Sequence, residues 1–291
     1  MNVLLTGARG FCGSYLQHSL RDRAYTLWAA ARTWDNFPGI QSNCKALETD
    51  FSDFRCLPKR IDVVVHTAAS LSVGPAENID FQRNNTDLTR NLVKYAIDSG
   101  ARLFIFFSAI SVYGSSESSI VSEVTPCRNP DPYSLSKLES EKFLAENKHA
   151  ISSLSLRLPS VVGPGARHGW LTGIANKMRR NDPVTVINPE TPFNNAIHIS
   201  DLADFIKKLI AVPPTGAEKI NLALDDQMPI AELVSSLKSL LRSESTLTSK
   251  IDATRPGFMI DSALAREKFG WRSMTVHPFL RQLASDHASA T

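Results

Sequence analysis

The chain has 291 residues, 43% of them hydrophobic, which is enough to bury a substantial core in one large domain or two lobes. Its 32 basic and 29 acidic residues leave a formal charge of +3, and no run of five like charges indicates a nucleic-acid-binding tail. No stretch approaches the roughly 18 apolar residues of a membrane span, and an N-terminus that goes directly into a strand leaves no room for a signal peptide. The four cysteines (Cys12, Cys44, Cys56, Cys127) lack metal-ligand spacing. We expect a soluble cytoplasmic protein that binds no metal, nucleic acid or membrane.

Short apolar runs alternate with helical patterns through the first half of the chain. The alternation predicts an α/β fold, with a doubly wound parallel sheet and crossover helices. The predicted strands are 3–6, 26–31, 45–48, 63–66, 103–107 and 154–158, and the predicted helices lie near 13–22, 87–99 and 133–146.

After Pro159 proline and glycine become frequent, as in Gly163-Pro164-Gly165. Helical patterns return at 171–180, 201–210 and 230–241. This change in character indicates a second, smaller structural unit, whose boundaries the sequence defines only to within several residues.

A glycine-rich segment, Gly7-Ala8-Arg9-Gly10-Phe11-Cys12-Gly13, directly follows the first predicted strand and opens the first predicted helix. Glycines in a strand–turn–helix unit let the backbone approach a pyrophosphate, whose charge then lies at the helix N-terminus. The segment predicts a dinucleotide-binding loop in which Gly7, Gly10, Phe11 and Gly13 approach the cofactor. Cys12 replaces an aliphatic residue there and is expected to be a small buried hydrophobe.

Tyr133 and Lys137 stand four residues apart, on one face of a predicted helix. An ammonium near a phenol favours the phenolate, so the pair predicts a lowered tyrosine pKa and a group able to transfer a proton. In combination with the N-terminal glycine loop, this spacing is a strong indication of an enzyme.

Together these segments resemble the extended branch of the short-chain dehydrogenase/reductase superfamily, which contains nucleotide-sugar epimerases, dehydratases and reductases. The resemblance covers nearly the whole chain and includes further ordered matches: Asp50-Phe51, Val64 to Ala69, Asn85 with Thr89 to Leu92, Ser108 to Gly114, Arg157-Leu158-Pro159, His198 to Ala203, Arg255-Pro256-Gly257 and Lys268 to Trp271. It implies a Rossmann domain formed by residues 1–160 with about 196–212. It also implies a smaller α/β substrate lobe formed by about 161–195 and 213–291.

The resemblance also implies where the cofactor binds. Asp50 and Phe51 would flank the adenine, Ala68 and Ala69 would line the pyrophosphate channel, and Pro159 and Ser160 would lie beside the nicotinamide amide. Asn85 would support the active-site strand, although an asparagine there could equally cap the next helix.

Two arginines indicate which nicotinamide cofactor the protein should prefer. Arg32 ends the second predicted strand, where NAD-preferring enzymes carry an acid that bonds the ribose 2′-hydroxyl. A guanidinium instead suits a 2′-phosphate, and Arg9 would converge on the same pocket. We therefore expect NADP as the cofactor, with NAD possible.

The roles that the resemblance implies for the catalytic pair are specific. Tyr133 would be the general acid/base, and Lys137 would bind the nicotinamide ribose. Family members also place a Ser or Thr four residues before the tyrosine of the Val-Tyr-Gly turn, and here that position is Ala109. Ser111 could approach the same side if the strand end stays extended; Ser108 or no hydroxyl at all are the alternatives.

Arg255 matches a family arginine that clamps the nucleotide diphosphate. The second clamp is missing, because Asn194 stands four residues before His198. We therefore treat Arg255, Asn194 and His168, a loop histidine and candidate second proton donor, as the substrate-binding set.

The leading functional prediction is an NADP-dependent reductase of a keto group on a nucleotide-activated deoxysugar. A 4-epimerase that returns the hydride to the same substrate is the alternative, and a non-catalytic NADP-binding sensor is the alternative of another class. A dehydratase is disfavoured, because Ile110 and Ser111 occupy the positions of its acid pair. A homodimer is also expected, formed by the apolar residues Leu92, Tyr95, Ala96, Leu138, Phe143 and Leu144 of two helices.

Overall fold

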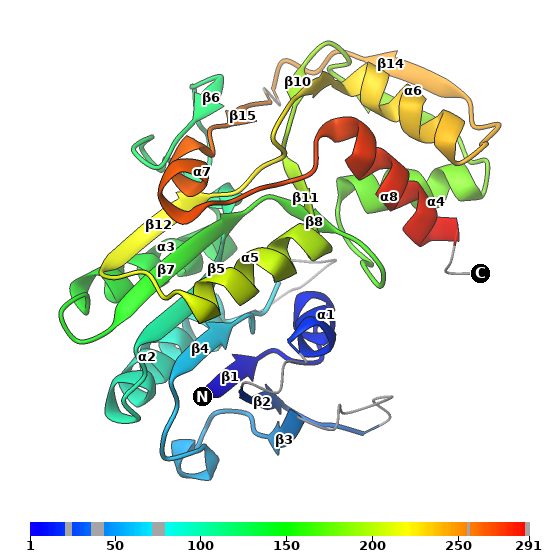
Figure 1. Ribbon diagram of the computed structural model, residues 1–291. Helices are drawn as coiled ribbons and strands as arrows, with labels where there is room; N and C mark the ends of the chain where they lie inside the picture. The colour runs from blue at the N-terminus through cyan, green and yellow to red at the C-terminus, as the bar shows by residue number, and fades with distance from the viewer. Residues whose placement is uncertain (21–24, 36–43, 72–78, 255–256, 289–291) are drawn as a thin grey trace. The chain divides into compact units, whose positions relative to one another are not determined.

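The structure is a computed structural model that describes residues 1–20, 25–35, 44–71, 79–254 and 257–288 (Figure 1). It divides into two compact units. The first comprises Met1–Ser115, Cys127–Arg157 and Ala203–Ile220; the second comprises Ser116–Pro126, Leu158–Leu202 and Asn221–Thr291. The division differs in its bounds from the expected domains, since it assigns Ser116–Pro126 to the second unit and Ala203–Ile220 to the first, and the roles expected for the two domains stay a prediction.

A seven-stranded sheet with the order β12-β7-β5-β4-β1-β2-β3 forms the centre of the first unit. The pairs from β3 through β5 are parallel, which confirms the predicted α/β Rossmann fold. The strands are β1 (Asn2–Thr6), β2 (Thr26–Ala31), β3 (Cys44–Glu48), β4 (Val63–His66), β5 (Leu103–Ala109), β7 (Ser152–Leu158) and β12 (Ala217–Asn221).

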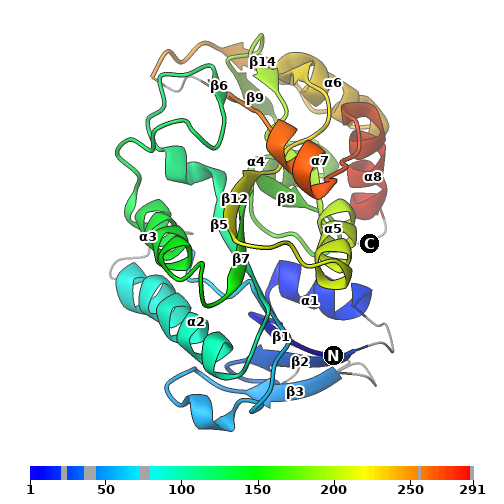
Figure 2. The same ribbon diagram turned by 60° about the vertical axis from the view of Figure 1, so that its left-hand side comes forward.

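Helices cover both faces of this sheet (Figure 2). On one face, α2 (Leu88–Asp98) and α3 (Pro132–Glu146) pack against Leu4, Val64 and Phe104. On the other face lie α1 (Phe11–Ser19) and α5 (Ile199–Ala211). Because successive side chains of a strand point to opposite faces, a sheet covered twice needs continuous apolar strands, and β5 is accordingly buried from Leu103 to Ser108.

Three short helical segments lie in the described connections between the main elements of the first unit. They are the 3₁₀ turns η1 (Phe54–Cys56) and η3 (Ile110–Tyr113) and the π-helical segment η2 (Gln82–Asp87), which runs directly into α2. π-helical segments often mark functional sites, and η2 borders the site described below.

The expected dimer surface on α2 and α3 is smaller than the sequence indicated. Leu92, Ala96 and Leu144 are buried in the core of their own unit, so they cannot also meet a partner. Exposed Leu135, with the partly buried Leu138 and Phe143, remains on α3. The homodimer stays a prediction, which light scattering at micromolar concentration tests.

The second unit has its own apolar core, which includes Val162, Leu171, Met178, Leu233 and Phe279. Its elements are β6 (Ile120–Val121), β8 (Ser160–Val162), α4 (Trp170–Arg179), β9 (Val184–Ile187), β10 (Pro192–Phe193), β11 (Ala196–His198), β13 (Met228–Pro229), α6 (Ile230–Leu240), β14 (Leu247–Lys250), β15 (Met259–Ile260), α7 (Ala263–Phe269) and α8 (Val276–Ala288). Its strands form four two-stranded pairs rather than one sheet.

Candidate active site

The glycine loop between β1 and α1 fits the close backbone packing that its sequence predicts. Gly7 has a φ of 68°, and a Cβ at this residue would lie 2.6 Å from the Ala68 nitrogen. A Cβ at Gly13 would overlap the Gly7 carbonyl oxygen. Only glycine tolerates these positions, so the loop stays tight and the α1 N-terminus, which begins at Phe11 after the cap Gly10, can accept an anion.

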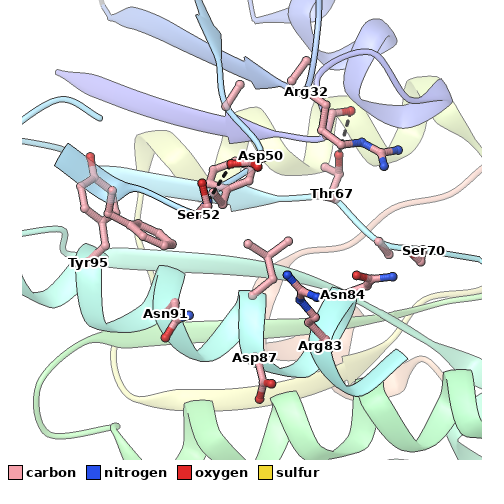
Figure 3. A pocket seen from close by; sticks show the side chains of 18 of the residues that line it. Arg32, Asp50, Ser52, Thr67, Ser70, Arg83, Asn84, Asp87, Asn91 and Tyr95 are labelled. Atoms are coloured by element: carbon pink, nitrogen blue, oxygen red, sulfur yellow. Dashed lines mark hydrogen bonds between the residues drawn. The ribbon is translucent and has the colours of Figure 1, made fainter. Parts of the chain in front are cut away.

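A pocket of about 1320 Å³ opens beside this loop (Figure 3). Eight of the predicted cofactor-binding residues line it: Gly7, Arg9, Gly10, Arg32, Asp50, Phe51, Ala68 and Ala69. They come from four separate strand ends and loops of the first unit, at the edge where α/β folds bind dinucleotides. The cradle left by the absent Cβ atoms, together with the size of the pocket, fits a dinucleotide.

The end of β2 forms one wall of the pocket through Ala30, Ala31, Arg32 and Thr33, none of which is acidic. Arg9 reaches this wall from the glycine loop, where its Nη1 donates a 2.8 Å hydrogen bond to the Thr33 carbonyl oxygen. The bond holds a second guanidinium beside the strand end that bears Arg32. The two cations give this part of the pocket a positive potential.

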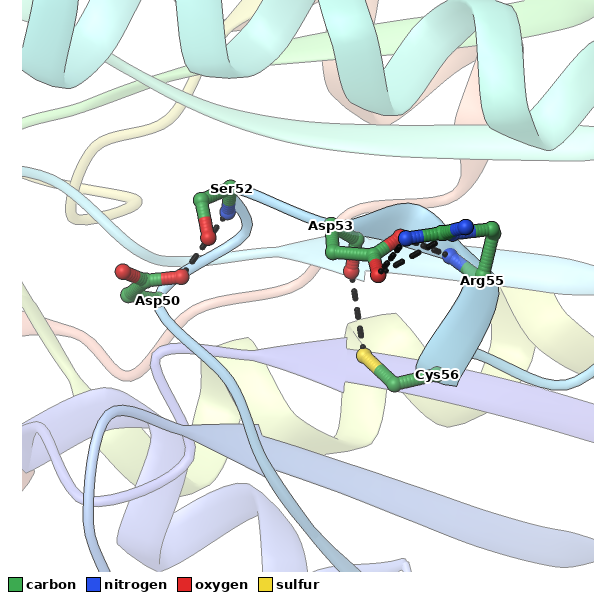
Figure 4. A network of polar contacts seen from close by, with 5 residues as sticks. All are labelled: Asp50, Ser52, Asp53, Arg55 and Cys56. Carbon is green, nitrogen blue, oxygen red and sulfur yellow. Dashed lines mark hydrogen bonds and ion pairs between the residues drawn. The ribbon is translucent and has the colours of Figure 1, made fainter.

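The loop after β3 lies next to this wall, because β2 and β3 are neighbouring strands, and it is held by local hydrogen bonds (Figure 4). The Ser52 amide donates to Asp50 Oδ1 at 2.9 Å, and the Ser52 hydrogen bonds, with a smaller contribution from Arg83, lower the pKa of Asp50. Asp53 accepts from Arg55 at 2.9 Å in the same way. Asp50 is therefore an ionised acceptor at the pocket rim.

Phe51 occupies a backbone conformation that bulky residues rarely adopt. Its φ is 62°, and its amide donates to Thr49 Oγ1 at 2.9 Å. Its ring centre lies 6.1 Å from that of Phe54, which in turn lies 5.9 Å from that of Tyr95. Unusual backbone geometry of this kind concentrates at ligand sites, and here it presents an aromatic wall to the pocket.

Sequence reasoning missed the wall that η2 and α2 contribute. Arg83, Asn84, Asp87, Asn91 and Tyr95 line the pocket from this side, and Figure 3 shows the helical segment that carries them across from the strand ends. Their helical spacing, with Lys94 and Asp98 continuing the same stripe, was a usable signal, because polar residues three and four apart share one helix face.

Asn85 is buried and does not cap α2, whose N-cap residue is Asp87. Its Oδ1 accepts from the Ser70 amide at 2.8 Å, and its Nδ2 donates to the Ser70 carbonyl oxygen and the Ser136 hydroxyl, both at 3.1 Å. The helix-capping alternative is therefore wrong. Asn85 instead ties Ser70, a pocket residue, to the turn of α3 between Tyr133 and Lys137.

Tyr133 and Lys137 lie one turn apart on α3, which begins with Asp131 as N-cap and Pro132 in its first turn. Lys137 Nζ donates to the Phe107 carbonyl oxygen at 2.8 Å and lies 5.7 Å from the centre of the Tyr133 ring. Phe81 meets that ring edge-on, with the ring centres 6.0 Å apart. The structure therefore keeps the phenol and the ammonium close together on the buried side of α3.

The pKa of Tyr133 differs from the sequence-based expectation. Burial raises it to about 12, and the Asp131 carboxylate adds to the shift. Burial also lowers the pKa of Lys137 to about 7, although Glu141 favours its charged form. The groups of the chain alone therefore do not depress the tyrosine pKa, because the phenolate loses its hydration and the lysine is itself close to losing its charge.

His66 lies beneath this pair as a structural residue. Its Nδ1 is 2.7 Å from the Thr6 hydroxyl and its Nε2 is 3.0 Å from the Thr89 hydroxyl. Burial, and then Lys137, lower the pKa of His66 to about 3, so the imidazole is neutral. Burial raises the pKa of the nearby Cys12 thiol to about 12, although the residue keeps some exposed surface, so the prediction of a small buried hydrophobe holds only in part.

Ser108 is part of a buried charged network. Its hydroxyl donates to Glu141 Oε1, and Glu141 accepts from Arg157 at 3.0 and 2.7 Å. Arg157 also donates to the Tyr113 hydroxyl at 2.8 Å. The side chains of Arg157 and Glu141 are 1% and 5% exposed. The Ser108 hydroxyl is therefore used within the fold and does not face solvent.

Ser111 has the opposite environment. Strand β5 ends at Ala109 and the chain turns into η3, so Ser111 is not on the extended strand end that the sequence argument assumed. It is exposed, and its hydroxyl accepts a 2.7 Å hydrogen bond from Ser134, the residue after Tyr133. The structure thus joins Ser111 to the helical turn that carries Tyr133, through a serine that sequence reasoning missed.

Four further predicted residues that the structure describes, Pro159, Ser160, His168 and Asn194, belong to the second unit. Pro159 precedes β8 and Ser160 begins it, and His168 lies exposed in the loop before α4. Asn194 is buried, and its amide is used by the backbone of Ile260, donating at 2.8 Å and accepting at 3.0 Å. It is therefore a structural residue here rather than a ready contact for a substrate. Arg255 lies outside the described residues.

No cluster of His, Cys, Asp or Glu among the residues that the structure describes could hold a metal ion. No described helix is long and apolar enough to cross a membrane.

Comparison with known proteins identifies the family. A sequence model described as the NAD dependent epimerase/dehydratase family matches residues 3–223. The chain belongs to this family. It is thus an NAD(P)-dependent enzyme of the extended short-chain dehydrogenase type, as its motifs predicted.

Individual relatives are distant but cover the chain almost completely. A UDP-glucose 4-epimerase of Azospirillum brasilense is 27% identical over 304 residues, which span 92% of this chain and 86% of the relative. A solved UDP-glucuronic acid 4-epimerase from Bacillus cereus, in complex with UDP-glucuronic acid and NAD, has a TM-score of 0.83 at 23% identity and full coverage of both chains. DesIV, a dTDP-glucose 4,6-dehydratase from Streptomyces venezuelae, has a TM-score of 0.81 at 19% identity, with 99% and 97% coverage. Such structural likeness shows the shared fold, on which several reactions occur.

Proposed function

We propose that this family member is an NADP-dependent reductase of a keto group on a nucleotide-activated deoxysugar. The observation that carries the cofactor choice is the wall at the end of β2. Arg32 stands there in place of an acid, and Arg9 is held beside the same wall by its bond to Thr33. Two guanidinium groups suit a 2′-phosphate and are poor partners for an unmodified 2′-hydroxyl.

The surroundings of Tyr133 support reduction. A bound nicotinamide would supply the hydride. A phenol with a pKa of about 12 keeps its proton at neutral pH, so Tyr133 is ready to donate it to the oxygen of the carbonyl that is being reduced. This protonated resting state matches the first step of a reduction, in which Tyr133 becomes the phenolate only as it gives up its proton, whereas an epimerase begins from the phenolate.

Lys137 and Ser111 complete the proposed machinery. Lys137 would hold the nicotinamide ribose while its bond to the Phe107 carbonyl oxygen fixes its direction. Ser111 is exposed next to the Tyr133 turn, which supports it as the hydroxyl that bonds the reacting oxygen in place of Ala109. In the second unit, His168 and Arg255 remain proposed substrate contacts.

A 4-epimerase is the second candidate, because relatives with that activity align along nearly the whole chain. The two reactions differ in their redox balance. A reductase oxidises one NADPH for each keto group that becomes an alcohol, whereas an epimerase returns the hydride to its substrate and consumes no cofactor.

In the test, the purified protein is given NADPH or NADH together with uridine or thymidine diphosphate 4-keto-6-deoxyglucose. The oxidation of the cofactor is followed by its nicotinamide absorbance. We expect stoichiometric oxidation with NADPH and a weaker reaction with NADH, because each arginine–phosphate bond contributes about 1.5–3 kcal/mol. Arg32→Asp should reverse the preference, and Tyr133→Phe should reduce turnover by about 10²–10⁴-fold. Equal use of NADH would refute the cofactor assignment. Interconversion of UDP-glucose and UDP-galactose without net oxidation would instead establish the epimerase, and binding without any turnover would leave a sensor.

A further inference from the structure

Helix α3 carries three buried serines, and one of them behaves differently from the others. Ser136 donates to the Tyr133 carbonyl oxygen at 2.6 Å, and Ser140 donates to the Ser136 carbonyl oxygen at 2.8 Å. Bonds of this kind, back to the preceding turn of the same helix, are the usual outcome for helical serines. Ser134 instead donates out of the helix, to the Ser111 hydroxyl at 2.7 Å.

The direction of that bond determines what Ser111 can do. A serine hydroxyl has one proton to donate and two lone pairs that accept. Ser111 accepts from Ser134, and among the described residues this is its one side-chain hydrogen bond. Its own proton is therefore available on the exposed side, and hydrogen-bond chains polarise their terminal donors.

Ser134 is well placed to fix this geometry. It has no exposed surface, and its amide is bonded to the N-cap carboxylate of Asp131 at 2.7 Å, so its backbone cannot shift without breaking the cap of α3. Ser134 also follows Tyr133 directly in the chain. One peptide bond and one hydrogen bond therefore join Tyr133 to the Ser111 hydroxyl and limit the distance between them.

We propose that Ser134 is a positioning residue: by donating to Ser111, it orients the Ser111 hydroxyl as the hydrogen-bond donor to the reacting oxygen that Ala109 cannot bond. This deepens the proposed function and rests on it, since Tyr133 must be the proton donor at the same oxygen. It also explains how a chain with alanine at the usual position could retain the reaction.

The experiment compares Ser134→Ala with Ser140→Ala, a matched control in which an equally buried serine of the same helix loses only a bond to its own helix. Turnover is measured with whichever substrate the cofactor test identifies. We expect Ser134→Ala to lower kcat about tenfold with little change in KM for NADPH, and Ser140→Ala to stay within about twofold. Ser134→Thr, which keeps the hydroxyl, should retain most of the activity.

Coupling to Ser111 separates positioning from a general loss of structure. If Ser134 acts through Ser111, the double variant Ser111→Ala/Ser134→Ala should be no slower than Ser111→Ala alone. Equal kcat values for Ser134→Ala and Ser140→Ala, or fully multiplicative losses in the double variant, would overturn the inference.

A second cycle needs no substrate. Urea unfolding is measured for the wild type, Ser111→Ala, Ser134→Ala and the double variant. The unfolding equilibrium constant of the double variant should differ about fivefold from the product of the two single effects, which corresponds to one hydrogen bond. The absence of such coupling would also overturn the inference. By contrast, full activity in Tyr133→Phe would refute the proposed function while leaving this measurement of the Ser111–Ser134 bond intact.

Discussion

The two ends of helix α3 use hydrogen bonds for different purposes. Toward its C-terminal half, Glu141 joins Ser108, Arg157 and Tyr113 in a network that excludes water. At its N-terminus, Ser134 reaches an exposed hydroxyl on η3. The first network contains a full ion pair, and the second contains only neutral hydroxyl groups.

The difference shows why two serines on either side of Ala109 have unequal chemical prospects. The Ser108 hydroxyl donates a hydrogen bond to a buried carboxylate, and removing this bond would leave part of the carboxylate's charge uncompensated. The Ser111 hydroxyl accepts a hydrogen bond and keeps its own O–H group for donating another. A hydroxyl that completes a buried ion network is therefore committed to the fold, whereas one that ends a neutral chain can serve a substrate.

The largest effect is expected when the buried carboxylate of the first network is removed. Glu141→Ala leaves Arg157 buried without its partner, and we expect a loss of about 3–5 kcal/mol in the free energy of unfolding, measured in urea. Glu146→Ala, an exposed acid at the end of the same helix, should change it by no more than about 0.5 kcal/mol. A loss of less than about 1 kcal/mol in Glu141→Ala would show that the network is not needed for stability.

Lys137 lies between the two networks and predicts a pH dependence. Its pKa falls from 10.5 to about 7 on folding, because burial outweighs the attraction of Glu141. The unfolded chain therefore binds more protons than the folded one between these values. This lysine's contribution to stability is full above pH 10.5 and is lost as the pH falls through about 7, at up to about 1.4 kcal/mol per pH unit.

Urea unfolding of the wild type and Lys137→Met across this range measures the effect. The difference between the two proteins should move in favour of the wild type as the pH rises. The substituted protein is the necessary reference, because the raised pKa values of Tyr133 and Cys12 act in the opposite direction at high pH. A constant difference across the range would show that Lys137 titrates normally.

The sequence predicted the centre of the sheet well because β1, β4 and β5 are almost completely buried. Each of the six predicted strands lies within one or two residues of an observed one. The seventh, β12, lies at one edge of the sheet, where Ala217–Asn221 contains a glutamate and a lysine, and it was missed. The other edge strand, β3, is equally polar and was predicted, so edge polarity weakens the sequence signal without removing it. The π-helical form of η2 has no sequence signature of comparable strength.

Some parts of the candidate site could likewise be predicted from the sequence, and others could not. The glycine loop and the Tyr133–Lys137 pair are local patterns, because their chemistry requires a fixed spacing along the chain. The partners that decide what each hydroxyl does are distant in sequence: Ser134 is 23 residues from Ser111, and Glu141 is 33 residues from Ser108. Alternation along a strand could not choose between the two serines, since the strand ends at Ala109 and the chain turns.

The smallest expected effect tests which of the residues near Ala109 supplies the hydroxyl to the reacting oxygen. Ala109→Ser restores a hydroxyl at the position where family members usually carry one, yet we expect kcat to stay within about threefold of the wild type, because Ser111 already supplies the hydrogen bond. Ser111→Ala should cost about 10²-fold, the typical loss for one donor to a developing negative charge. Adding Ala109→Ser to Ser111→Ala should then recover part of the loss.

Ser108→Ala is the control. Because the Ser108 hydroxyl bonds Glu141, this variant should be less stable, while its kcat should stay within about twofold of the wild type. If Ser108→Ala lost activity and Ser111→Ala did not, the assignment of the two serines would have to be exchanged.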